Sequence, residues 1–98
     1  MEIVVKHGNE LLVELTGRLD TNTSPELEKK LKEEEIKEDL VVLDFKALEY
    51  ISSAGLRVLL ASKKSLEAQG KKLEIHNIND VVREVFNVTG FANILTIK

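Results

Sequence analysis

The run from residue 39 to residue 45, DLVVLDF, constrains the fold of this 98-residue chain more than any other segment. It is short and apolar on both of its alternating faces, which is typical of a strand in the middle of a parallel sheet. A chain that contains such a strand must also supply neighbouring strands and the helices that cover the sheet.

Alternating patterns predict those neighbouring strands. Residues 2–17 are typical of a hairpin, with turn residues at Gly8 and Asn9 and a second strand that we expect Gly17 to end. Residues 71–77 alternate as a further strand, and residues 93–98 predict a short final one.

Three segments with helical spacing separate these strands. Residues 23–35 predict a helix capped by Thr23 or Ser24, and residues 53–69 predict a second helix that ends at Gly70. Residues 79–90 predict a third, which Asn79 or Asp80 can cap.

The element order is therefore ββαβαβαβ, within one domain that spans residues 1–98. Repeated strand–helix–strand units predict an α/β fold with a mixed, largely parallel β-sheet flanked by helices.

Composition excludes several classes of function. The net charge is −3 with acidic and basic residues interspersed, so no basic patch favours direct binding to nucleic acid or to a membrane. The chain has no cysteine, which excludes disulfides and thiolate chemistry and fits a reducing cytoplasm. The N-terminal residues are too charged for a secretion signal, and no apolar run approaches the length of a membrane span. We expect a cytoplasmic protein.

Catalytic constellations are also missing from the sequence. Its two histidines, His7 and His76, have no metal-ligand partner at a recognisable spacing. The segment GLRVLL lacks a phosphate-binding P-loop, and SSAG lacks the flanking glycines of a nucleophile elbow. The sequence therefore predicts no catalytic residue, no metal and no cofactor.

Three polar residues remain as candidate functional residues. Ser52 and Ser53 lie in YISSAGLRVLL, at the start of the second predicted helix. Asp20 ends the segment GRLD, just before the first predicted helix. From the residues alone, Ser53 is a plain helix cap and Asp20 a loop carboxylate near a helix N-terminus.

Three blocks of sequence resemble a known family. LTGRLDTNTSPELEKKL, LVVLDFKALEYISSAGLRVLL and GKKLEIHNINDVVREVFNVTGFANIL follow in the order and spacing of a bacterial anti-sigma factor antagonist, a single STAS domain. The resemblance covers almost the whole chain and implies a mixed sheet flanked by helices. It also implies partners: an anti-sigma factor that is often an ATP-binding serine kinase, and a serine phosphatase that resets the cycle.

The resemblance assigns roles to particular residues. Ser53 stands in the family's phosphoacceptor position, and Ser52 stands where an aspartate is usual. Asp20 matches an acidic residue near the family's partner-binding surface. The implied partner-binding set is Asp20, Ser52, Ser53, Ala54, Gly55 and Leu56, where Gly55 would let the partner's backbone approach.

Two departures from the family pattern leave alternatives open. Ser52 replaces the usual aspartate, and Ala54 replaces a hydroxylated residue, so the acceptor could be Ser52 or the chain could remain unphosphorylated. A second interpretation is a STAS scaffold of another signalling or transport complex, in which Ser53 is only a cap. We also expect Asp20→Ala to weaken partner binding with little change in thermal stability.

Overall fold

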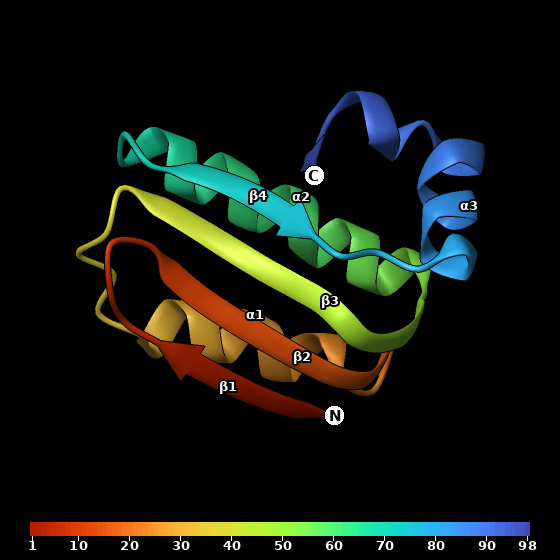
Figure 1. Cartoon of the computed structure of the whole chain (residues 1–98), viewed down its shortest axis with the longest axis horizontal. Coiled ribbons are helices and arrows are strands. Elements are labelled where there is room, and N and C mark those ends of the chain that lie inside the picture. The colour runs from red at the N-terminus through yellow and green to blue at the C-terminus, as the bar shows by residue number, and fades with distance from the viewer.

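The computed structural model describes all residues from 1 to 98 as a five-stranded sheet with three α-helices (Figure 1). This order confirms the predicted ββαβαβαβ arrangement. The strands are β1 (Glu2–Lys6), β2 (Leu11–Leu19), β3 (Leu40–Ile51), β4 (Lys72–His76) and β5 (Thr96–Ile97). The helices are α1 (Ser24–Glu33), α2 (Ser53–Ala68) and α3 (Asp80–Thr89), and a short 3₁₀ turn, η1 (Phe91–Asn93), precedes β5.

The spatial order of the strands is the order of the chain, β1-β2-β3-β4-β5. Only β1 runs antiparallel to its neighbour, and the other four strands are parallel. The central position of β3 explains its composition, because Val41, Val42 and Leu43 are all almost completely buried. The apolar run at residues 39–45 therefore predicted the central strand correctly.

One face of the sheet packs against α1 and α2, which lie side by side behind it in Figure 1. Along each strand, alternate side chains point to this face. Val13, Leu43 and Ile75 form one cross-strand row of it and are fully buried. Leu27 of α1 and Leu59 of α2 belong to the same core. No helix covers the opposite face of the sheet, toward the viewer of Figure 1.

Both central strands run further than the sequence pattern indicated. β2 continues through Gly17 to Leu19, so the prediction that Gly17 ends the strand is wrong. Gly17 has φ +103°, a conformation that glycine adopts without a side-chain clash, and the strand can pass through it. The pairing of β2 with β3 shifts register on both sides of this region, which breaks the alternation by which a strand is recognised.

The helices and the last strand differ from the predictions mainly at their ends. α1 covers residues 24–33 rather than 23–35. Asn79, not Asp80, caps α3, because its side chain accepts a hydrogen bond from the Val82 amide at 2.8 Å. The final strand is only two residues long, because residues 91–93 form the 3₁₀ turn.

Candidate functional site

The candidate site lies where β2 and β3 end side by side. Leu19 of β2 pairs with Ile51 of β3, and the Ser52 amide donates to the Leu19 carbonyl at 2.9 Å. This contact brings Asp20 and the start of α2 to one edge of the sheet, although they are about thirty residues apart in sequence. Figure 1 shows this edge at the right, where β3 leads into α2.

Ser52 is the residue that caps α2. Its backbone is extended (φ −99°, ψ 174°), and its hydroxyl oxygen accepts a hydrogen bond from the Gly55 amide at 3.3 Å. Its carbonyl accepts from the Leu56 amide at 3.0 Å. These are the bonds of a helix N-cap, which satisfy amides that the first turn leaves unpaired. The interpretation of Ser53 as a plain cap is therefore wrong, because Ser52 already holds that position.

Ser53 is the first residue of α2, and its side chain is exposed. Its hydroxyl makes no hydrogen bond to another group of the chain, so a partner or an enzyme could reach it without breaking an internal contact. Phosphate is tolerated at such a position, since the free amides and the helix dipole both favour an anion.

Gly55 and Leu56 face the interior of the domain. A Cβ on Gly55 would lie 2.8 Å from Ile51 Cγ1 and 2.9 Å from the Leu19 carbonyl oxygen. The expectation that Gly55 opens the helix to a partner's backbone is therefore wrong. Its missing side chain instead lets α2 pack closely against the ends of β2 and β3.

Asp20 organises the turn that joins β2 to α1. Its Oδ1 atom accepts hydrogen bonds from the amides of Asn22 at 3.0 Å and Thr23 at 3.1 Å. Its carbonyl oxygen accepts from the amide of Ser24 at 2.8 Å and from that residue's hydroxyl at 2.5 Å. Asp20 thus holds the entry to α1, and we expect Asp20→Ala to lower stability as well as binding. This revises the expectation from the sequence.

The side chains of Thr23 and Ser24 do not cap α1 as the sequence predicted. Thr23 occupies the N-cap position, but its hydroxyl accepts no bond from the helix. It donates instead to the Arg18 carbonyl at 2.6 Å and accepts from the Asp20 amide at 2.8 Å. The hydrogen bonds that Asp20 receives, first of all from the Thr23 amide, lower the pKa of its carboxyl below the ordinary value. Asp20 is therefore a carboxylate at neutral pH.

Arg18 and Tyr50 belong to the same edge but were missed by the sequence analysis. They are register partners in β2 and β3, and the Arg18 guanidinium carbon lies 4.6 Å from the centre of the Tyr50 ring. This distance is that of a cation–π contact. Each residue lies two positions before a candidate residue, Asp20 or Ser52, and this matched spacing was the available signal.

An open depression of about 370 Å³ lies between the first turns of α1 and α2, and Ala54, the residue after Ser53, is part of its lining. Ala54 and Arg57 of α2 form one wall, and Thr21 and Pro25 lie on the other. Arg57 is exposed and forms no ion pair, so it adds an unpaired positive charge beside the helix start. Of the charged and polar groups of the candidate site, only Arg57 lines this hollow, and the Ser53 hydroxyl and the Asp20 carboxylate lie outside its lining.

The model of the STAS domain family matches residues 1–98. The chain belongs to the STAS domain family. Among curated relatives of this STAS domain, the anti-sigma-B factor antagonist of Bacillus subtilis is 30% identical over 97% of the chain and 87% of its own length. BtrV of Bordetella bronchiseptica, named as a candidate anti-sigma factor antagonist, is 39% identical over 89% of the chain and 76% of its own length.

Solved structures share the fold of this STAS domain. An anti-sigma factor antagonist from Mycobacterium paratuberculosis superposes with a TM-score of 0.83 at 22% identity, over 98% of this chain and 83% of that one. The phosphorylated form of SpoIIAA, a Bacillus cell fate determinant, gives 0.73 at 18% identity, over 99% and 91%. A sulfate transporter family protein from Wolinella succinogenes gives 0.78 at 21% identity, over 89% and 71%. At these identities the likeness concerns the fold alone.

The structure of this STAS domain also bears on metal binding and on membrane insertion. No group of three or more histidine, cysteine, aspartate or glutamate side chains is placed to hold a metal ion. No helix is both long enough and apolar enough to cross a membrane.

Proposed function

We propose that this STAS domain is an anti-sigma factor antagonist whose binding surface includes Asp20, Ser52, Ser53 and Ala54. It binds an anti-sigma factor and thereby releases a sigma factor. Phosphorylation of Ser53 by a serine kinase activity of the anti-sigma factor ends the interaction, and a serine phosphatase restores it. The exchange takes place in the cytoplasm.

The main support for this proposal is that the Ser53 hydroxyl is exposed and makes no hydrogen bond within the domain. Ser52 supplies the cap of α2, so the exposed Ser53 hydroxyl has no structural duty within the domain. The names of the curated relatives, from Bacillus subtilis and Bordetella bronchiseptica, support the same type of partner. SpoIIAA, which shares the fold, has a structure in its phosphorylated form, and this supports a phosphorylated state of the present chain.

Charge explains how phosphorylation would end binding while the fold persists. A phosphate on Ser53 would add about −1.5 to −2 charges at neutral pH. The first turn of α2 tolerates an anion, so the domain stays folded. Against an apolar or acidic partner surface the same charge is unfavourable. A loss of about 3 kcal/mol lowers the affinity roughly a hundredfold, which is enough for a switch.

Buried residues support the surface from beneath. Gly55 and Leu56 hold the start of α2 against Leu19 and Ile51, so they fix the position of Ser53 without offering side chains to a partner. The Asp20 carboxylate stands on the neighbouring turn and is held by its own hydrogen bonds. A surface fixed in this way loses little conformational entropy when it binds a partner.

The deciding experiment starts from the native host. Co-purification with the tagged chain, followed by mass spectrometry, should identify an ATP-binding kinase-like protein. Capture of membrane transport proteins instead would favour the scaffold interpretation, for which the fold of the Wolinella succinogenes sulfate transporter family protein is the supporting likeness.

With the partner in hand, kinase treatment and site mapping should place phosphate on Ser53. Binding constants should then separate three variants. Ser53→Ala should bind and resist the kinase, Ser53→Asp should bind more weakly, and Ser52→Ala should still be phosphorylated. Phosphate on Ser52, or undiminished binding by Ser53→Asp, would refute the assignment.

A further inference from the structure

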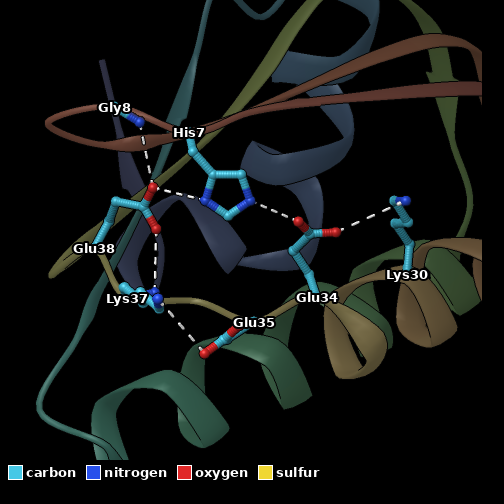
Figure 2. A network of polar contacts seen from close by, with 7 residues as sticks. All are labelled: His7, Gly8, Lys30, Glu34, Glu35, Lys37 and Glu38. Atoms are coloured by element: carbon cyan, nitrogen blue, oxygen red, sulfur yellow. Dashed lines mark hydrogen bonds and ion pairs between the residues drawn. The ribbon is translucent and has the colours of Figure 1, made fainter.

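His7 lies between two carboxylates (Figure 2). It precedes the first residue of β2, whereas Ser53 lies near the other end of that strand, where Leu19 pairs with Ile51. Its Nδ1 atom is 2.8 Å from Glu38 Oε2, and its Nε2 atom is 2.6 Å from Glu34 Oε1. The Gly8 amide donates to the same Glu38 oxygen at 3.3 Å. The ring comes from the turn between β1 and β2, while both glutamates belong to residues 34–39, the loop between α1 and β3. Two segments about thirty residues apart are thus joined by one side chain.

The number of protons that these contacts require is set by their geometry. An ionised carboxylate only accepts hydrogen bonds, so each ring nitrogen of His7 must donate one. Only the protonated ring has two N–H groups. A neutral ring would place a nitrogen lone pair against a carboxylate oxygen, and one of the two contacts would have to open. The two ring nitrogens also face different carboxylates, so a single metal ion could not replace the proton.

Two lysines lie in the same cluster, and their positive charges oppose a further proton on His7. Lys30 lies 3.7 Å from Glu34, and Lys37 lies 3.8 Å from Glu35, as Figure 2 shows. The Glu38 side chain is only 7% exposed, which leaves its carboxylate dependent on the contacts of this cluster. The hydrogen bonds that the ring makes to Glu34 and then to Glu38 nevertheless raise the pKa of His7 above its ordinary value of 6.5. The pKa of Glu38 is lowered, although burial opposes this, by hydrogen bonds that include those from His7 and Gly8.

The loop that contains Glu34 and Glu38 is also hydrogen-bonded to the segment that joins α2 to β4. Lys71 Nζ donates to the Glu38 carbonyl at 2.8 Å, and the Lys72 amide donates to the Asp39 carbonyl at 2.8 Å. No backbone–backbone hydrogen bond joins the β1–β2 turn to this loop. The contacts of His7 and Gly8 with the two glutamates are therefore what holds it there.

We propose that His7 is a proton-dependent clasp that fastens the β1–β2 turn to the α1–β3 loop. The protonated ring bridges Glu34 and Glu38 and closes the clasp. Loss of the proton breaks one bridge and frees the turn. Because the folded-state pKa is raised, the stabilisation is fully present below pH 6.5 and is lost as the pH rises through the higher pKa of the folded protein.

The direct test uses NMR to measure the titration of the His7 ring and the hydrogen exchange of the Gly8 amide in the same protein. In the wild-type protein, the His7 ring should titrate above 6.5. Protection of the Gly8 amide against hydrogen exchange, corrected for the intrinsic rate, should fall several-fold over the same pH range. A His7 ring that titrates at or below the ordinary value, or a Gly8 amide whose protection is independent of pH, would overturn the proposal.

Three variants sharpen the test. His7→Gln should lower Gly8 protection at every pH and remove its pH dependence. Glu34→Gln keeps the Glu38 contact, so the His7 ring should titrate at a lower pH than in wild type and the clasp should open earlier. His76→Gln is the matched control, because His76 lies in β4 and contacts Glu74 instead. The same pH dependence in His7→Gln as in wild type would refute the clasp. None of these positions belongs to the Ser53 surface, so the outcome is independent of the proposed function.

Discussion

Replacing Gly55 by alanine should destabilise the domain, although alanine is the better helix former. A methyl group at this position would lie 2.8 Å from Ile51 Cγ1, 2.9 Å from Leu19 Cγ and 2.9 Å from the Leu19 carbonyl oxygen. The carbonyl is backbone, and it also accepts the bond from the Ser52 amide at 2.9 Å. The clash therefore cannot be relieved by rotating a side chain alone, and α2 must move away from the strand ends.

Two opposing effects set the magnitude. Exchanging glycine for alanine inside a helix contributes about 1 kcal/mol of stability. Adding a methyl group to a closely packed site typically costs about 1–3 kcal/mol, and more where the backbone must shift. With three contacts below 3.0 Å, we expect the second effect to exceed the first by about 1–2 kcal/mol. For a domain of this size, that corresponds to a fall in Tm of roughly 5–15 °C.

The assay is urea denaturation and thermal unfolding, with Gly8→Ala as the matched control. A Cβ on Gly8 would meet only the Glu10 carbonyl oxygen at 3.8 Å, an ordinary contact. Gly8→Ala should therefore be neutral or slightly stabilising, since it restricts the unfolded chain. If Gly55→Ala is as stable as wild type, the close packing of α2 on β2 and β3 does not limit that position and our reasoning is wrong.

Three further predictions concern the candidate surface. Ser52→Ala should lower the free energy of unfolding by about 1 kcal/mol through loss of the α2 cap, whereas Ser53→Ala should leave it nearly unchanged in urea titrations; equal losses would contradict our assignment of the cap. Asp20→Asn, which retains an acceptor oxygen, should be more stable than Asp20→Ala by thermal unfolding. Because the folded-state pKa of Asp20 is lowered, the wild type should also have a higher Tm than Asp20→Asn above pH 3.8, and this difference should vanish as the pH falls through the lower pKa of the folded protein. A difference in Tm that persists in acid would contradict a stabilising role of the Asp20 carboxylate. Tyr50→Ala should weaken binding to the co-purified partner, with a loss of binding free energy larger than its loss of unfolding free energy. Unchanged affinity would exclude this residue from the interface.

Much of the fold was determined by local sequence patterns. The run at residues 39–45 predicted a central parallel strand because it is short and apolar on both alternating faces, which is typical of a strand buried on both sides. The three helices followed from apolar spacing and from glycines such as Gly70 and Gly90, which have positive φ angles. These signals lie within short stretches of chain, so they predict strands and helices without knowledge of the tertiary structure.

The ends of the strands were decided by tertiary contacts. Gly17 looked like a strand terminator, yet β2 runs on to Leu19 because β3 lies beside it and pairs with it through a shifted register. Ile94 and Leu95 have an apolar strand-like composition, but the turn after α3 brings only two residues into pairing with β4. Strand pairing depends on a distant segment, and a local pattern does not record it.

The roles of the site residues divide in the same way. The position of Ser53 at the start of a helix could be read from the sequence, because helix starts have local signals. Which serine caps the helix, and whether Gly55 faces a partner or the core, depends on backbone angles and on the packing of α2 against Leu19 and Ile51. The bridge from His7 to Glu34 and Glu38 had no signal at all in the sequence. It exists only because the sheet and α1 bring two turns together at one end of the domain.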